Sequence, residues 1–179
     1  MTIGGWNLEG EALSRYPEIR LIAWSLGVWV ASVVFGKRQI PFTEAIAVGG
    51  TLYPVHDQWG IPETIFRGTL DNLTEEGMHR FNRRMCGKRD LLGAYEQIPP
   101  RPLTDHPGRI GLPVHRNKEN TISFPLIQWM DAYPHPLRRP DLSCREPACL
   151  WQDRCPITEI EAPHYPFYLW KQWNEIWKQ

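Results

Sequence analysis

IRLIAWSLG, residues Ile19–Gly27, is the stretch of sequence that decides the fold. Ile19–Trp24 is an apolar run of the kind that forms a buried strand in a parallel sheet, and Val28–Phe35 has the composition of the helix that follows such a strand. Ser25 is therefore expected at a strand-to-helix turn. A serine at such a turn is typical of the nucleophile elbow, whose pattern G-x-S-x-G pushes the hydroxyl out above the sheet.

The elbow pattern has Ala23 in place of its first glycine. Alanine is still small, so we expect the tight bend to be retained. The backbone N–H of Leu26, at the start of the expected helix, is predicted to point at a developing oxyanion, where the helix N-terminus adds positive potential. A serine after a strand can also be purely structural, and the pattern alone leaves that alternative open.

The composition of the 179-residue chain indicates one globular domain. Its formal net charge of zero gives no electrostatic footprint for nucleic acid, and no apolar run approaches the roughly 20 residues that span a bilayer. The first residues lack the basic and apolar regions of a secretory signal, and four cysteines are too few for a disulfide framework. We expect a cytoplasmic protein whose partners include neither nucleic acid nor a membrane.

A second buried strand is expected at Glu44–Val48, after the turn that ends the elbow helix. The order strand, helix, strand implies a parallel crossover, so the predicted fold class is α/β. His56 and Asp57 lie in the loop after this strand, where open α/β sheets gather their ligand-binding residues. A solvated pair of side chains is the plainer explanation for them.

Two amphipathic helices are expected next along the chain. The first covers Glu63–Arg67 and ends at Gly68, and the second begins after a cap at Asn72 or Thr74. The apolar stripe of the second helix predicts packing, with its arginines on the solvated face. Between strands of one sheet, such a pair of helices is typical of a lid over an active site.

The amino-acid composition and the hydrophobic periodicity of the chain change over residues 104–150. Ten of the 17 prolines fall between Pro99 and Pro147, and no sustained helical or strand period crosses that region. We therefore divide the single domain, 1–179, into three parts. These are an elbow and lid region (1–103), an irregular, proline-rich segment (104–150), and a final region (151–179) that ends the sheet.

The final region contains the second candidate catalytic residue. A last strand is expected at Ile157–Ile160, a loop at Ala162–Pro166, and a terminal helix at Phe167–Trp177 with three tryptophans on one face. His164 lies in that loop, where a chain order of serine, acid and histidine puts the general base. A lone loop histidine can be structural, but its combination with Ser25 favours acyl-transfer chemistry.

Several strings of the sequence resemble a known family. They are LIAWSLGVW (Leu21–Trp29), IPFTEAIAVGGTLYP (Ile40–Pro54), GIPE (Gly60–Glu63), GTLDNL (Gly68–Leu73) and APHYPF (Ala162–Phe167). Over roughly Leu8–Pro102 and Trp151–Gln179, the chain is similar to the BioG-type pimeloyl-[acyl-carrier protein] methyl ester esterases of biotin synthesis.

The resemblance implies an incomplete α/β-hydrolase-like parallel sheet with lid helices. It also implies a cytoplasmic serine carboxylesterase, without metal or cofactor, that removes the methyl ester from a pimeloyl chain carried by acyl carrier protein. In that reaction Ser25 is the nucleophile and His164 is the general base.

Two features of the family are missing from the sequence. Family members open with a strand that ends in a Gly-Trp-Gly-like turn, which supplies a second oxyanion N–H. Gly4-Gly5-Trp6 follows no expected strand, so we expect an N-terminally truncated sheet and do not carry that role over. The family also carries its triad acid in a DRIFPAENQ-like string before the last strand. That string is absent here, and neither Asp141 nor Asp153 is assigned in its place.

Two other classes of protein remain as alternatives. The first is a catalytically inactive remnant of the esterase that lacks the oxyanion strand and the triad aspartate. The second is a small zinc-binding module built from Cys144, Cys149, Cys155 and His164, although the C-x4-C-x5-C spacing lacks the short C-x2-C pairs of strong zinc signals.

The missing acid string suggests a shift of reading frame. Read one base later, permitted codons for Arg139–Leu150 can encode DRIFPAENQLAY, which leads straight into Trp151. Our hypothesis is that about Thr104–Leu150 is translated out of frame and that the frame is restored near Trp151. The shift of reading frame would then explain both the high proline content and the loss of hydrophobic periodicity.

We predict that the DNA encoding this segment contains the acidic string in the shifted frame. Sequencing the gene from upstream of Met1 through Trp151 checks this directly. Codons over Arg139–Leu150 that cannot give that string contradict the hypothesis.

Overall fold

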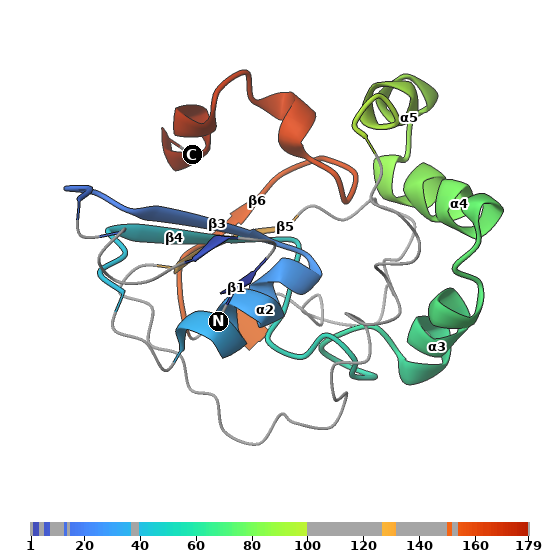
Figure 1. Ribbon diagram of the computed structural model, residues 1–179, viewed down its shortest axis with the longest axis horizontal. Helices are drawn as coiled ribbons and strands as arrows, with labels where there is room; N and C mark the ends of the chain where they lie inside the picture. Colours follow the sequence, from blue (N-terminus) through green and yellow to red (C-terminus); the bar gives the residue numbers. More distant parts are fainter. Residues whose placement is uncertain are drawn as a thin grey trace.

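The computed structural model describes residues 2–3, 6–7, 13, 15–36, 40–99, 127–131, 150–151 and 154–178. The strands in chain order are β1 (Thr2–Ile3), β2 (Trp6–Asn7), β3 (Arg20–Trp24), β4 (Glu44–Val48), β5 (Ile127–Asp131) and β6 (Ile157–Glu159). The helices are α2 (Leu26–Phe35), α3 (Glu63–Asp71), α4 (Glu75–Cys86), α5 (Arg89–Tyr95) and the short 3-10 helices η3 (Phe167–Leu169) and η4 (Trp173–Lys178). Figure 1 shows their arrangement.

The central sheet has four strands in the order β3-β4-β5-β6, and each neighbouring pair is parallel. The register of the first pair runs from Arg20 opposite Glu44 to Trp24 opposite Val48. The expected strand at Glu44–Val48 is confirmed with its bounds, and the α/β fold class is confirmed with it. Because all four strands run in one direction, their carboxyl ends lie at one edge of the sheet.

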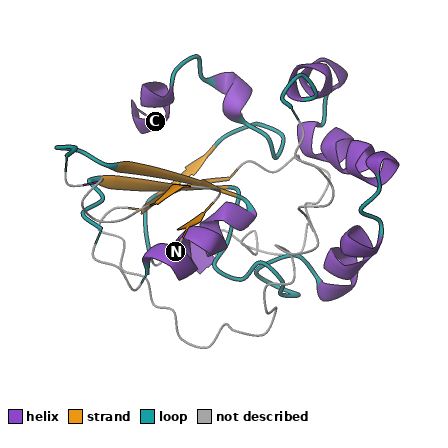
Figure 2. Ribbon diagram, in the orientation of Figure 1, coloured by secondary structure: helices purple, strands orange, loops and turns teal. Residues whose placement is uncertain are grey.

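The two faces of the sheet are covered by different parts of the chain (Figure 2). On one face, Ala23 and Ala47 pack with Val28 and Ala31 of α2 and with the buried Trp151. On the other face, a second cluster joins strand residues to the C-terminal segment: Ile22, Trp24, Ile46, Val48, Phe167, Trp170, Ile176 and Trp177. This alternation along β3 and β4 is the period of two that a sheet buried on both sides requires.

The three helices α3, α4 and α5 lie beyond the carboxyl edge of the sheet (Figure 1). Helix α4 begins at the cap Thr74, whose hydroxyl oxygen accepts the N–H of Gly77, and ends at Gly87 in the left-handed conformation. A third cluster, built on Met85, Cys86 and Leu92, joins α4 and α5 to Trp24 of the sheet. Three helices lie here instead of the expected pair, and α5 had no separate signal in the sequence.

Helix α3 continues past Gly68, where the sequence predicted its end. The helix runs to Asp71, and the side-chain amide of Asn72 donates to the carbonyl of Gly68 at 2.7 Å. A glycine inside a helix costs only about 1 kcal/mol relative to alanine, which the capping bond offsets. Gly68 was therefore a poor signal for a helix end.

Two segments expected to be irregular contain strands. Thr2–Ile3 and Trp6–Asn7 pair as an antiparallel ladder, although the sequence suggested no strand before Trp6. Within 104–150, Ile127–Asp131 forms β5 in the middle of the sheet. β1 and β2 have two residues each, whereas β5 has five. The pairing of all three comes from backbone bonds that sequence periodicity does not record.

The C-terminal segment is not the single helix that was expected over Phe167–Trp177. It consists of η3 and η4, separated by Trp170 in an extended conformation (φ −117°, ψ 133°). The break changes which tryptophans share a face. Trp170 and Trp177 pack on the sheet, whereas Trp173 is 65% exposed.

Across the described residues, no helix is long and apolar enough to cross a membrane. The same residues contain no group of three His, Cys, Asp or Glu side chains that could hold a metal ion. Cys144 and Cys149 of the zinc alternative lie outside the described part of the chain, as do Asp141 and Asp153.

Gly50 is the glycine that allows the loop after β4 to lie against the elbow. A Cβ atom there would overlap the carbonyl oxygen of Ser25 and the side chain of Val28, whereas a Cβ at Gly27 meets nothing within 4 Å. The small residue that the bend depends on is therefore not the glycine of the elbow pattern but one on the neighbouring strand's loop.

We predict that Gly50→Ala lowers the free energy of unfolding by about 1–3 kcal/mol, because the added methyl group forces the elbow and the loop apart. Gly68→Ala is the matched control, since a Cβ there meets nothing within 4 Å. It should stabilise the chain by up to about 1 kcal/mol. Urea unfolding of both variants measures the difference, and equal stabilities would contradict the assigned role of Gly50.

Candidate active site

Ser25 has the backbone conformation of a strained elbow. Its φ is 53° and its ψ is −125°, and it is the one non-glycine residue with positive φ in the described part of the chain. Its N–H donates to the carbonyl of Val48 at 3.0 Å, which ties the turn to the end of β4. Such a conformation costs about 1–3 kcal/mol and is found mostly at functional sites. The expected sharp turn between β3 and α2 is confirmed.

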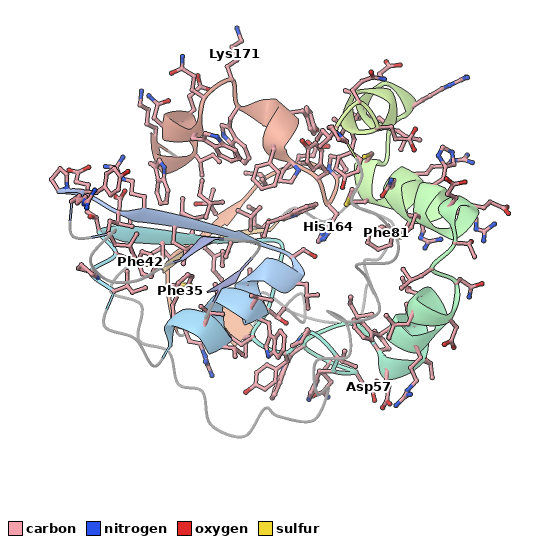
Figure 3. The ribbon with its side chains drawn as sticks, in the orientation of Figure 1. Phe35, Phe42, Asp57, Phe81, His164 and Lys171 are labelled. Atoms are coloured by element: carbon pink, nitrogen blue, oxygen red, sulfur yellow. The ribbon has the colours of Figure 1, made fainter. Side chains whose placement is uncertain are left out.

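His164 reaches Ser25 from the other end of the sequence. The distance from His164 Nε2 to Ser25 Oγ is 2.8 Å, a hydrogen bond between residues 139 positions apart. Figure 3 shows His164 at the edge of the sheet that faces α4. The sequence predicted that these two residues meet above the carboxyl edge of a parallel sheet, and the geometry agrees.

Burial keeps the His164 imidazole neutral to a lower pH than usual. Desolvation lowers the pKa of its imidazole from 6.5 to about 4, so the ring is neutral at pH 7. A neutral imidazole can accept a proton at Nε2, whereas an imidazolium cannot. The pair therefore has the protonation state that a serine nucleophile and its base require.

Leu26 is the first residue of α2. Its N–H has no acceptor within the helix, because the first backbone donors of any helix lack a partner one turn earlier. The N-terminus of α2 also contributes positive potential beside Ser25. This position is the one that the sequence predicted for an oxyanion donor.

Two contacts of the histidine loop have no signal in the sequence. The indole N–H of Trp24 donates to the carbonyl of His164 at 2.8 Å, and the N–H of Tyr165 donates to the carbonyl of Met85 at 3.2 Å. Trp24 stood in the elbow pattern as a variable residue. Its partner is 140 positions away, so no local spacing could identify the bond.

His56 and Asp57 do not join this pair. The Nδ1 atom of His56 accepts the N–H groups of Gln58 and Trp59 at 3.1 and 3.2 Å, and its ring stacks on Trp59 with centroids 4.7 Å apart. His56 thus stabilises its own turn, and Asp57 is exposed. The explanation as a solvated side chain holds for Asp57, whereas His56 is partly buried and has a structural role in its turn.

The other candidate residues do not form a site within the described chain. Cys155 is partly buried near Trp151, with its thiol 3.9 Å from the Trp151 carbonyl, while Nε2 of His164 bonds Ser25. The two form no part of a metal cluster among the residues placed. Gly4 and Gly5, to which the family's second oxyanion role was not carried over, lie outside the described residues.

An elbow serine bonded to a loop histidine, at the carboxyl edge of a parallel sheet, defines an α/β-hydrolase-like protein. Comparison with known families agrees with that class. Residues 7–176 match the family model described as pimeloyl-ACP methyl esterase BioG. The chain therefore belongs to the BioG family.

Individual relatives extend the comparison. The chain is 38% identical over 172 residues to an uncharacterised protein of Haemophilus influenzae, covering 96% of this chain and 77% of that protein. It matches the crystal structure of BioG from Haemophilus influenzae with a TM-score of 0.71 and 35% identity, covering 92% of this chain and 75% of that one. It is also 42% identical over 100 residues to a malonyl-[acyl-carrier protein] O-methyltransferase of Bacteroides fragilis, covering 55% of this chain and 20% of that protein.

We predict that the His164 imidazole titrates near pH 4, well below the usual 6.5, because its charged form lacks solvent. As the pH falls, the ring should stay neutral through 6.5 and gain its proton only near the lower value. NMR titration of the histidine ring signals measures this, with His164→Gln assigning the resonance. A midpoint at 6.5 or above would show that the ring is not desolvated in this way.

Proposed function

We propose that this chain is a serine carboxylesterase that removes the methyl ester from a pimeloyl group carried by acyl carrier protein, in the synthesis of biotin. The observation that carries the proposal is the 2.8 Å bond between Ser25 Oγ and His164 Nε2, at a strand-to-helix turn where Ser25 has positive φ. Membership of the BioG family supports the choice of substrate.

The first half of the reaction acylates the enzyme. Neutral His164 takes the proton of the Ser25 hydroxyl at Nε2, and Oγ attacks the ester carbonyl. The N–H of Leu26 donates to the oxygen that becomes negative, where the N-terminus of α2 stabilises it. The tetrahedral intermediate collapses as the C–O bond to the methoxy group breaks. His164 returns its proton to that oxygen, and methanol leaves.

The second half releases the acid. Water takes the place of methanol, His164 accepts one of its protons, and the hydroxide oxygen attacks the acyl carbonyl on Ser25. The second intermediate collapses with the proton returned to Ser25 Oγ, which leaves a free carboxylic acid on the pimeloyl chain that ionises by releasing its proton to water. One water is consumed, one methanol is formed, and no metal or cofactor is needed.

The substrate is presented by a partner protein. Acyl carrier protein would bring its acyl chain to the carboxyl edge of the sheet. The helices α3, α4 and α5 lie beyond that edge (Figure 1). The proposed reaction takes place in the cytoplasm. An inactive remnant of the esterase is the competing proposal, and the same assay separates the two.

We predict that the purified chain converts the methyl ester of pimeloyl-carrier protein to the free acid, with methanol as the other product. Ser25→Ala should lower kcat at least about a thousandfold, because the nucleophile is lost. Mass spectrometry of the carrier protein, which differs by one methylene between substrate and product, measures the conversion.

Ser32→Ala is the matched control for that assay. Ser32 lies in α2, the helix that follows Ser25, is 3% exposed, and its hydroxyl donates to the carbonyl of Trp29, so its loss should leave kcat unchanged. A folded wild-type chain without conversion supports the remnant. Conversion that survives Ser25→Ala contradicts the assigned nucleophile.

A further inference from the structure

The peptide group that joins His164 to Tyr165 is held at both of its polar atoms. Its carbonyl oxygen accepts the indole N–H of Trp24 at 2.8 Å. Its N–H donates to the carbonyl of Met85, near the end of α4, at 3.2 Å. One bond comes from the end of β3, next to the nucleophile, and the other comes from α4, so this peptide group is fixed between the sheet and that helix.

We propose that Trp24 is a positioning residue, whose indole N–H holds the backbone of His164 so that Nε2 meets the hydroxyl of Ser25. The inference rests on the proposed function and adds a role for a residue whose indole N–H bonds the backbone of His164 and not its ring nitrogens. Trp24 directly precedes Ser25 in the chain, so the donor that fixes the histidine is attached to the nucleophile's own backbone.

The Trp24 ring has little freedom to move. It lies 5.5 Å from the His164 ring, 5.8 Å from Tyr165 in an edge-on contact and 5.5 Å from Phe167 in another. Aromatic rings in such contacts gain about 0.5–1.5 kcal/mol beyond simple burial. The indole N–H is therefore aimed at the His164 carbonyl by its packing, and not only by the hydrogen bond itself.

The bond matters because the carbonyl of His164 belongs to the backbone that carries its ring. If the donor is lost, this partly buried carbonyl loses that bond, and the peptide group can rotate about its remaining bond to Met85. Such a rotation shifts the Cα–Cβ direction of His164 and moves Nε2 away from Ser25. A displacement of about 1 Å in a catalytic group can lower the rate by about a hundredfold.

The contact to α4 acts on the same peptide group from the opposite side. Beyond the bond to Met85, a Cβ at Gly87 would lie 3.2 Å from Pro163, so the end of α4 is packed closely on the loop. This second support keeps the loop in place when Trp24 is changed. The effect of losing the indole N–H should therefore fall on the orientation of His164 and not on the fold.

Trp24→Phe tests the proposal, since phenylalanine keeps an aromatic ring and removes the N–H. We expect kcat for the carrier-borne methyl ester to fall about 10- to 100-fold, with KM changed by less than about twofold. The rate at which a fluorophosphonate labels Ser25 should fall by the same factor, because that reaction needs the same proton transfer. A merely structural residue would not lower both rates equally while KM stays constant.

Trp170→Phe is the matched control. Trp170 packs against Phe167 in the same aromatic region, so the control makes the same chemical change away from His164. It should leave kcat and the labelling rate unchanged. Urea unfolding of both variants shows whether each is folded at the assay temperature.

Trp24→benzothienylalanine separates packing from hydrogen bonding, because this residue has the size of tryptophan and lacks the N–H. It should show the same loss of kcat as Trp24→Phe. Wild-type rates in both Trp24 variants overturn the proposal, as does an equal loss in Trp170→Phe. A folded wild-type chain that the fluorophosphonate does not label contradicts the proposed function. A wild-type chain that is labelled, together with Trp24 variants labelled at the same rate, contradicts only the role of Trp24.

Discussion

The short loop from β6 to His164 is the constraint on which the site depends. Ser25 follows β3 and His164 follows β6, so the loop must cross three strand spacings, about 14 Å at about 4.8 Å each. The five residue-to-residue steps from Glu159 to His164 can span at most about 17 Å of backbone. The side chains of Ser25 and His164 add to that reach, and the bonds from Trp24 and Met85 hold the loop in place. A short loop over a parallel sheet thus brings together two residues from opposite ends of the chain.

The sequence predicted those parts of the site that depend on local order. Strand, turn and helix around Ser25 follow from an apolar run and a serine beside small residues, and β4 follows from a run of the same kind. His164 could be placed because a strand and a proline-flanked loop precede it. In each case the pattern lies within about ten residues, over which hydrophobic periodicity is informative.

The rest of the site depends on contacts between distant segments, which leave no periodic signal. Gly50 is needed because its loop touches the elbow, and Trp24 acts through a carbonyl 140 positions away. The C-terminal tryptophans suggested one helical face, but the extended backbone at Trp170 splits the segment. Helix propensity reflects a residue and its neighbours in sequence. In the C-terminal segment, tertiary packing overrides it and determines the backbone conformation.

Strand β5 illustrates that a strand in the middle of the sheet can keep its place when its side chains change. Its place between β4 and β6 is fixed by ladder bonds that any backbone other than proline can make, so Ile127–Asp131 can carry β6, and with it His164, without a particular set of side chains. A triad carboxylate has no such freedom, because its function is its side chain. A frame shift confined to this region would therefore preserve the meeting of Ser25 and His164 while removing the acid that orients the base. The serine and histidine pair and the acid are thus separable in this fold, since the pair depends on the backbone of β5 and the acid depends on the identity of one residue.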